Sequence, residues 1–264
     1  MLPIVDTPTI QYVVEEAIDS GLTDIIIVIG RGKRSIEEHF GRNFELERLL
    51  EVQGKRDDLD SIRSMSDRAD IHFIWQDDQK GLGDAIGCAS RHVGSEPFAV
   101  LLGDTILEST EKRPVIRQLV DTYQRFKEPI VGLEEVDRSL VTRYGIVSGQ
   151  EIEDDTFLLS DLVEKPSVDE APSNLAIASR FILTPAIFEY LSKIRPEAGK
   201  EVQLTDALRN LLKVGAIYGL RVAGVRHDIG NKLDFLKTSI LYGLKREDIG
   251  PELREWINKL VGDR

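Results

Sequence analysis

The chain has few of the residues that form covalent cross-links or zinc sites. Its 264 residues include one cysteine, Cys88, and four histidines. A single cysteine cannot form an internal disulfide or a cysteine cluster for zinc, so we expect Cys88 to be a small buried apolar residue. No Ser–His–Asp, Cys–His or His-x-x-x-His arrangement is evident. The sequence therefore does not indicate a zinc enzyme.

Positive charge and long hydrophobic runs are also scarce. Lys plus Arg number 34 against 46 Asp plus Glu, which gives a net charge of −12. Such a chain has no electrostatic attraction to a polyanion, so nucleic-acid binding is not expected as its main function. The longest apolar runs, such as residues 25–29, are too short to cross a bilayer, and the N-terminus shows no secretion signal. We therefore expect a cytoplasmic protein without a membrane partner.

The hydrophobic pattern alternates between strands and helices. A β-branched run at 24–29 indicates a strand buried on both faces, whereas 31–71 is polar and mostly helical. The apolar side of that polar segment consists of Phe44, Leu46, Leu49, Leu50 and Val52. The other expected strands are 71–75, 98–102, 129–136, 145–148, 157–163, 175–183 and 216–222. The other expected helices are 7–20, 83–92, 114–126, 201–212, 231–244 and 251–261.

This order of elements predicts an α/β fold with a mostly parallel, doubly wound sheet flanked by helices. Between 145 and 183 the strands follow one another without long helices, so we expect a small antiparallel portion there. We expect one domain over residues 1–264. In doubly wound sheets ligands bind beyond the carboxyl ends of the strands, so the residues after each strand are the candidates for a site.

The segment 76–84 follows a strand and opens a helix. With Asp104 about 20 residues further on, it is close to a dinucleotide-binding fingerprint. Two features argue against a nicotinamide dinucleotide: Ile86 stands where the third glycine belongs, and polar residues 77–80 separate the strand from Gly81. Alternatively, Gly81 and Gly83 allow the backbone to approach a flat or polar ligand such as a base. A plain loop is the remaining alternative.

Two aspartates from distant parts of the chain could share a cation. Asp104 follows the expected strand at 98–102, and Asp228 lies between an expected strand and a helix. Mg²⁺ is bound by few carboxylates together with phosphate oxygens, and two carboxylates held together repel unless a cation compensates them. Each aspartate could instead cap a helix or a turn. We expect the neighbouring His227 to be structural.

Charged and polar residues also follow the expected strand at 157–163. The Lys165 ammonium can act on a phosphate and the Glu164 carboxylate can accept sugar hydroxyls, although a surface ion pair is the simpler alternative. The segment 201–206 predicts a helix start, with Thr205 and Asp206 as competing caps.

Taken together, an ordered set of motifs resembles one enzyme family. The motifs are Gln76, residues 80–83 (KGLG), 101–104 (LLGD), 144–145 (YG), 163–166 (VEKP), 172–177 (PSNLAI), 201–206 (EVQLTD) and 227–232 (HDIGNK). In this order they resemble the bacterial and archaeal UTP–glucose-1-phosphate uridylyltransferases over essentially the whole chain. No single motif carries the resemblance.

The resemblance implies a Rossmann-like nucleotidyltransferase fold and a reaction of UTP with glucose 1-phosphate that gives UDP-glucose and pyrophosphate. It implies Mg²⁺ as cofactor and small-molecule substrates as partners, and it leaves a homo-oligomer open. By position it implies Mg²⁺ ligation by Asp104 and Asp228 and a sugar-phosphate contact by Lys165. It implies sugar contacts by Gly145 and Glu164, with Tyr144 beside them as a substrate-binding residue. It also implies uracil contacts by Gln76 and Gly81, and less defined roles near the sugar for Glu201 and Asp206. A thymidylyltransferase acting on the same sugar phosphate is the nearest alternative.

The chemistry is consistent with this assignment. A phosphate oxygen of glucose 1-phosphate attacks the α-phosphorus of UTP in line, and pyrophosphate leaves. Both substrates are anionic, so a cation on the two aspartates together with Lys165 offsets their repulsion and aligns them. No general base is needed, because the attacking phosphate is already ionised.

The start of the chain departs from the family pattern. In the family a first strand and a Gly-x-Gly-Thr-Arg loop, which grips the triphosphate, precede the segment that matches residues 1–6. We therefore expect a domain that lacks one strand–loop unit of roughly 20–30 residues. Three explanations are open: a start assigned to an internal methionine, a truncated form that binds sugar nucleotide with little or no turnover, or a regulatory or scaffolding subunit.

Overall fold

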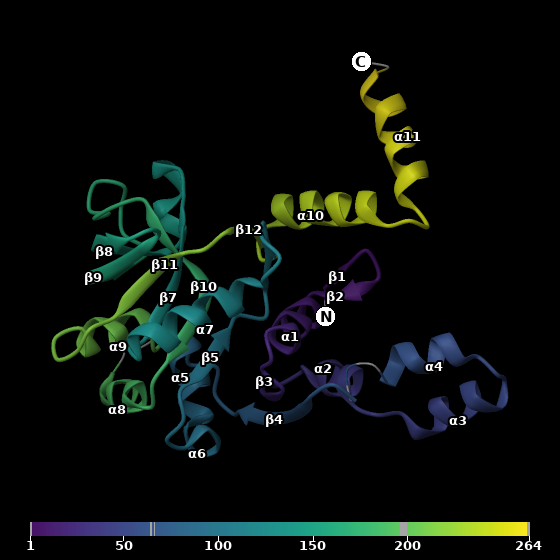
Figure 1. The fold of residues 1–264 in the computed structure, drawn as a ribbon, viewed down its shortest axis with the longest axis horizontal. Helices are drawn as coiled ribbons and strands as arrows, with labels where there is room; N and C mark the ends of the chain where they lie inside the picture. Colours follow the sequence, from purple (N-terminus) through teal and green to yellow (C-terminus); the bar gives the residue numbers. More distant parts are fainter. Residues whose placement is uncertain (1, 64, 66, 196–199, 263–264) are drawn as a thin grey trace.

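The computed structural model describes residues 2–63, 65, 67–195 and 200–262 (Figure 1). Its helices are α1 (Thr9–Asp19), α2 (Arg34–Phe40), α3 (Phe44–Val52), α4 (Arg56–Arg63), α5 (Leu82–Cys88), α6 (Ser90–Val93), α7 (Val115–Phe126), α8 (Ala186–Lys193), α9 (Leu204–Leu211), α10 (Lys232–Lys245) and α11 (Gly250–Gly262), with a 3₁₀ helix η1 at Arg138–Arg143. Its strands are β1 (Pro3–Ile4), β2 (Thr7–Pro8), β3 (Asp24–Gly30), β4 (Asp70–Gln76), β5 (Phe98–Leu101), β6 (Thr105–Ser109), β7 (Ile130–Glu135), β8 (Gly145–Glu153), β9 (Thr156–Glu164), β10 (Leu175–Leu183), β11 (Tyr218–Arg221) and β12 (Gly224–Asp228).

The main sheet is mixed, and the prediction of a mostly parallel sheet is wrong for it. It has six strands in the order β5-β10-β7-β11-β9-β8. Within the described residues of this sheet, β7 and β11 pair in parallel and the other pairings are antiparallel. A second parallel pair, β3 with β4, forms a separate two-stranded sheet. The short connection from β8 to β9 forces the chain to reverse, which only antiparallel pairing allows.

Helices cover both faces of the six-stranded sheet (Figure 1). On one face the buried side chains of α8 and α9, such as Ile187 and Leu208, pack against Val131 and Leu133 of β7. On the other face α7 packs through its buried residues, including Leu119, against β7 and β10. Because alternate residues of β7 enter these two cores, the sheet is the centre of the fold.

The strands β1, β2, β6 and β12 were not predicted, and the last two matter most for the site. β6 and β12 pair antiparallel from Thr105 with Asp228 to Ser109 with Gly224. The sequence analysis assigned no strand or helix to either segment. The paired residues of β6 and β12 are more than a hundred positions apart in the chain, so the pairing becomes visible only in the folded structure.

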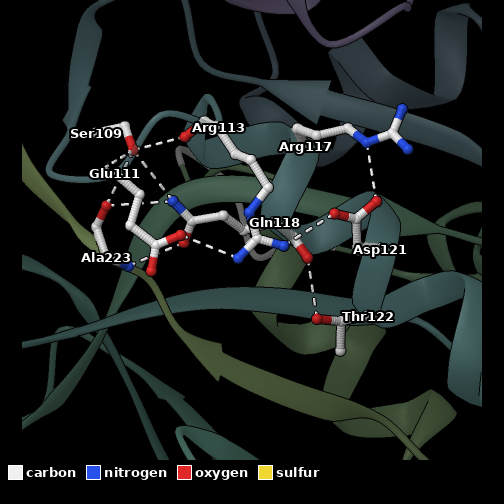
Figure 2. Close-up of polar contacts among 8 residues, drawn as sticks. All are labelled: Ser109, Glu111, Arg113, Arg117, Gln118, Asp121, Thr122 and Ala223. Atoms are coloured by element: carbon white, nitrogen blue, oxygen red, sulfur yellow. Dashed lines mark hydrogen bonds and ion pairs between the residues drawn. The ribbon is translucent and has the colours of Figure 1, made fainter.

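At its Ser109–Gly224 end, the β6–β12 pair is hydrogen-bonded to α7 through the buried side-chain amide of Gln118 (Figure 2). Gln118 donates from Nε2 to the carbonyl of Ala223 at 3.2 Å and accepts from the amide of Ala223 at 2.9 Å. It also donates to Ser109 Oγ at 3.3 Å. Gln118 therefore bonds Ala223 as a neighbouring strand would, and it fixes the turn that leads into β12.

The N-terminal part is less buried than its hydrophobicity suggests. In β3 only Ile27 and Ile29 are fully buried, so the expectation of burial on both faces is wrong for the rest of that strand. The expected apolar side of α3 is largely in solvent, with Phe44 at 70% and Val52 at 78% exposure and Leu50 buried. Figure 1 shows α3 and α4 reaching away from the sheets as an arm. No helix within the described ranges is long and apolar enough to cross a membrane.

Candidate functional site

The β6–β12 ladder brings Asp104 and Asp228 together. Thr105 is paired with Asp228 in the ladder, and the amide of Ile229 donates to the carbonyl of Asp104 at 3.1 Å. The two aspartates therefore stand at the same end of one short ladder, although the chain separates them widely. Asp104 is exposed and Asp228 is half-buried.

Both carboxylates retain oxygens that could bind a cation. Asp104 Oδ1 accepts from Thr105 Oγ1 at 3.4 Å, and Asp228 Oδ1 accepts from the amide of Gly230 at 3.0 Å. Within the part of the chain that the structure describes, neither carboxylate pairs with a lysine or arginine. Hard oxygen donors with no protein cation beside them suit Mg²⁺, which completes its shell with phosphate oxygens and water. The same residues contain no group of three or more His, Cys, Asp or Glu side chains placed to hold a metal ion, so the two aspartates are not part of a larger cluster of this kind.

His227, next to Asp228, was expected to be structural, and it is buried in the fold. Its ring is buried, with Nδ1 3.3 Å from Thr238 Oγ1 and Nε2 3.5 Å from a carboxylate oxygen of Glu108. Burial lowers the pKa of His227, against a smaller opposing effect of Glu108. Nδ1 is thus within hydrogen-bonding distance of Thr238, whereas the buried Nε2 makes no hydrogen bond among the described residues.

A second group of predicted residues meets where β8, β9 and α9 converge. Gly145 and Glu164 are paired across the β8–β9 ladder, and Thr205 Oγ1 donates to Glu164 Oε2 at 3.1 Å. A Cβ at Gly145 would lie 2.8 Å from Ile177 Cδ1 and 3.1 Å from Glu164 Oε2, so a larger residue would displace this carboxylate. The close approach explains the glycine at this position.

Thr205 and Asp206 do not cap a helix. α9 begins at Leu204 after Gln203, whose side chain makes no capping bond. Both candidates therefore lie inside the first turn, and the capping prediction is wrong. Thr205 instead contacts Glu164. The sequence predicted no such contact, although Thr205 lies in the motif at 201–206. Asp206 is exposed, lines a surface hollow beside α8, and is not brought to the other predicted residues.

Lys165 directly follows β9 and has an unusual backbone. Its φ of 45° lies in the left-handed region, and its amide donates to the carbonyl of Tyr144 at 3.1 Å. Non-glycine residues in this region cost free energy and cluster at functional sites. The side chain is exposed and, among the described residues, its ammonium forms no ion pair, so the surface-pair alternative is not observed.

The ring of Tyr144 is covered by a guanidinium that the sequence reasoning missed. The Cζ of Arg226 lies 3.6 Å from the ring centroid, and its Nε is 2.5 Å from Glu134 Oε1. Burial raises the pKa of Glu134, with Arg226 opposing that effect and Asp228 adding to it. Arg226 lies two residues before Asp228, and no local pattern marks it in the sequence.

A third group forms around the glycine loop at 80–83. Gln76, buried at the end of β4, donates from Nε2 to Asp84 Oδ2 at 2.7 Å and to the carbonyl of Gly81 at 3.3 Å. Gly81 has a φ of 102°, and a Cβ there would lie 2.6 Å from the Cβ of Glu201. The segment that begins at Glu201 therefore presses against the glycine loop.

Backbone hydrogen bonds hold this contact in place. The amide of Val202 donates to the carbonyl of Lys80 at 2.7 Å, and the amide of Gly83 donates to the carbonyl of Val202 at 2.9 Å. Because Glu201 touches Gly81 and Thr205 touches Glu164, the segment 201–206 connects the second and third groups of predicted residues.

Comparison with known proteins points to one family. The family model described as nucleotidyl transferase matches residues 1–242. A protein of Staphylococcus saprophyticus named UTP–glucose-1-phosphate uridylyltransferase 2 is 46% identical over 260 residues, which are 98% of this chain and 89% of the relative. A Bacillus subtilis protein named UTP–glucose-1-phosphate uridylyltransferase is 43% identical over 261 residues, 99% of this chain and 89% of the relative.

Solved structures agree with these matches. A UDP-glucose pyrophosphorylase complexed with UDP-glucose is similar with a TM-score of 0.85 and 40% identity, covering 93% of this chain and 90% of that one. A UTP-bound UGPase from Acinetobacter baumannii is similar with a TM-score of 0.89 and 34% identity, covering 98% of this chain and 90% of that one.

Proposed function

Since the chain belongs to the nucleotidyl transferase family and, within it, to the UTP–glucose-1-phosphate uridylyltransferases, we propose that it forms UDP-glucose and pyrophosphate from UTP and glucose 1-phosphate with Mg²⁺. The observation that carries the proposal is the β6–β12 ladder, which holds Asp104 and Asp228 at one end, where neither carboxylate forms an ion pair with a lysine or arginine of the described residues. Such a pair suits a reaction between two anionic substrates. An acidic protein would repel these substrates, but a metal ion held by the two carboxylates can bind them.

In the proposed reaction a phosphate oxygen of glucose 1-phosphate bonds to the α-phosphorus of UTP while the bond to pyrophosphate breaks. When bound to the two aspartates, Mg²⁺ supplies neutralisation of the phosphate charge. Asp228, in the last pair of the ladder, and Asp104, directly before that pair, would hold it. No residue has to remove a proton, because the nucleophile is an ionised phosphate.

The remaining residues bind and orient the substrates. Lys165 extends an unpaired ammonium from a constrained backbone, which supports a role on the phosphate of glucose 1-phosphate. Glu164 presents a carboxylate steadied by Thr205 to the sugar hydroxyls, with the Gly145 backbone close beside it. Gln76 and Gly81 contact the uracil, and the bond from Gln76 to Asp84 orients the amide for it.

The test is turnover of the full chain with UTP and with dTTP, followed by pyrophosphate release and product formation. We expect equal amounts of UDP-glucose and pyrophosphate, a preference for UTP, and loss of turnover when a chelator removes the metal. Binding of UDP-glucose without pyrophosphate release would instead indicate a non-catalytic binder, and a preference for dTTP would indicate a thymidylyltransferase. Either result would contradict the proposal.

A further inference from the structure

The largest fully buried side chain lies beside Asp104 and has no place in the proposed reaction. Arg180 of β10 has 0% exposure, and two of its guanidinium nitrogens donate to one oxygen, Oε2 of Glu16, at 2.7 Å from Nη2 and 3.0 Å from Nε. The Glu16 side chain is 8% exposed. Burying two charges is costly unless their remaining hydrogen-bonding groups are also satisfied.

The other donors of the guanidinium bond to the backbone on both sides of Asp104. Arg180 Nη1 donates to the carbonyl of Leu102 at 3.5 Å, and Nη2 donates to the carbonyl of Thr105 at 3.0 Å. Nη1 also donates to the carbonyl of Ser179 at 3.0 Å. One planar group with donors in a fixed fork therefore spans the residues before and after the turn that carries the aspartate.

β10 is distorted at the place where it meets this turn. Its register with β7 shifts between Ile177 and Phe181, and Ser179 adopts a left-handed φ of 60°. The carbonyl of Ser179 accepts from the amide of Leu102 at 3.3 Å, and its Oγ lies 3.5 Å from Thr105 Oγ1. Bulges re-aim side chains, and strained residues persist only where their surroundings hold them. Here the surroundings are the turn of Asp104.

The ion pair is itself anchored to two helices. Glu16 lies in α1, and its Oε1 accepts from the amide of Ile116 in the first turn of α7 at 2.9 Å. α1 also packs directly against the turn, since a Cβ at Gly103 would lie 2.8 Å from Ile10 Cδ1. Through Glu16 the guanidinium is thus fixed to α1 and α7, and its bonds to the turn of Asp104 extend this rigid arrangement to the turn.

We propose that Arg180, supported by Glu16 and by the Ser179 bulge, is a positioning residue that sets where the Asp104 carboxylate stands relative to Asp228. This inference rests on the proposed metal-binding role of Asp104. The guanidinium bonds to the backbone of the turn and is fully buried, so it presents no surface to a substrate. A looser turn would leave the two carboxylates farther from a shared cation, so metal affinity would fall even in a folded protein.

The test compares Arg180→Lys with Glu47→Gln, which alters a buried carboxylate in the α3–α4 arm. Lysine keeps the charge opposite Glu16 but cannot span both carbonyls with a rigid fork. The probe is Mn²⁺ in place of Mg²⁺, titrated by electron paramagnetic resonance on the full chain with UDP-glucose present. We expect Arg180→Lys to weaken Mn²⁺ binding roughly 10–100-fold, as losses of groups behind metal ligands do, and Glu47→Gln to leave it unchanged.

Thermal melting without metal and steady-state kinetics separate positioning from general destabilisation. Both variants are expected to melt below the wild type, but only Arg180→Lys should raise the Mg²⁺ concentration needed for turnover while the KM for glucose 1-phosphate is kept. Wild-type Mn²⁺ affinity in a folded Arg180→Lys protein would overturn the proposal. If that variant does not fold, Ser179→Val disturbs the bulge, because a β-branched residue strongly disfavours a left-handed φ, and it leaves the Arg180 and Glu16 side chains in place. Wild-type Mn²⁺ affinity in Ser179→Val would overturn the proposal equally.

Failure of the proposed function gives a different result. In that case Asp104→Asn would keep the Mn²⁺ affinity of the wild type, or the wild type would not transfer a uridylyl group. If Asp104→Asn loses Mn²⁺ and Arg180→Lys does not, the proposed function stands and only the positioning role is wrong.

Discussion

Glu16 and Glu47 are both buried carboxylates paired with arginine, yet their surroundings differ. The Glu47 side chain is 5% exposed, but its partners Arg42 and Arg63 are 41% and 32% exposed. Glu16 is 8% exposed and its partner Arg180 is 0% exposed. The first pair therefore lies at a surface with water within reach, whereas the second is enclosed by the fold.

The two pairs also connect different things. Arg42 and Arg63 come from the ends of the same α3–α4 arm, so their bonds to Glu47 hold a local hairpin together. Arg180 comes from 164 residues away, and it also holds the turn of Asp104. Burial of a carboxylate alone does not mark a functional region. What matters is which other groups its arginine satisfies.

The sharpest way to separate the two pairs is to neutralise each carboxylate. Glu16→Gln should lower the free energy of unfolding by about 3–5 kcal/mol, because it leaves the Arg180 charge buried and uncompensated. Glu47→Gln should cost less, since its arginines can turn to water. Urea unfolding of both proteins measures the difference. Equal losses would show that the two pairs are energetically alike.

The region held by Arg180 should also be the one where charge matters for turnover. Asp104→Asn is expected to lower kcat on the order of 10²- to 10³-fold or more, because an electrostatic group of the reaction is lost. Its melting temperature should stay close to that of the wild type, since the side chain is exposed. Near-normal turnover of Asp104→Asn would show that the region held by Arg180 is no more important for the reaction than the arm around Glu47.

Lys165 allows the same test with a closely matched control. Lys165→Ala should reduce kcat on the order of 10²-fold, through loss of the cation on the sugar phosphate. Lys127 is a second exposed lysine with a left-handed φ, 58°. It lies at the end of α7 and outside the predicted site. Lys127→Ala should leave kcat unchanged, and a similar loss in both variants would argue that the effect is not specific to the site.

The smallest expected effect concerns the arm alone. Hydrogen bonds from Arg42 and Arg63 lower the pKa of Glu47 from its ordinary 4.5 to about 2. A lowered pKa in the folded state means that the pair stabilises the arm above pH 4.5, and that this contribution is lost as the pH falls toward 2. Hydrogen-exchange protection of α3 and α4, corrected for intrinsic rates, should therefore drop over this range in the wild type.

Glu47→Gln provides the control for that measurement. Its arm should be less protected at neutral pH and should show little further loss between pH 4.5 and pH 2. If wild type and variant lose protection in parallel, the carboxylate of Glu47 is not the group responsible.

The residues of the candidate site were selected from the sequence by their places at expected strand ends. In the structure Asp104 and Lys165 follow β5 and β9, and Gln76 ends β4. The contacts among these residues were not visible. The pairing of β6 with β12 joins segments without a local pattern, and the role of Thr205 was mistaken for helix capping because Thr and Asp near a helix start favour that interpretation.

The direction of the main sheet shows the same limit. Periodicity identifies a strand from local sequence, but whether it runs parallel or antiparallel depends on how the chain returns to it. The apolar side of α3 was also identified correctly as a pattern, yet most of it faces solvent.

Most of the helices and strands, and the candidate residues at the strand ends, could be inferred from local sequence alone, since propensity, periodicity and motif spacing act over a few residues. The joining of Asp104 to Asp228, the contact of 201–206 with the glycine loop, and the buried Arg180–Glu16 pair were settled only by the folded chain. Each of them depends on groups far apart in sequence, whose desolvation and hydrogen bonding are determined when the core closes around them.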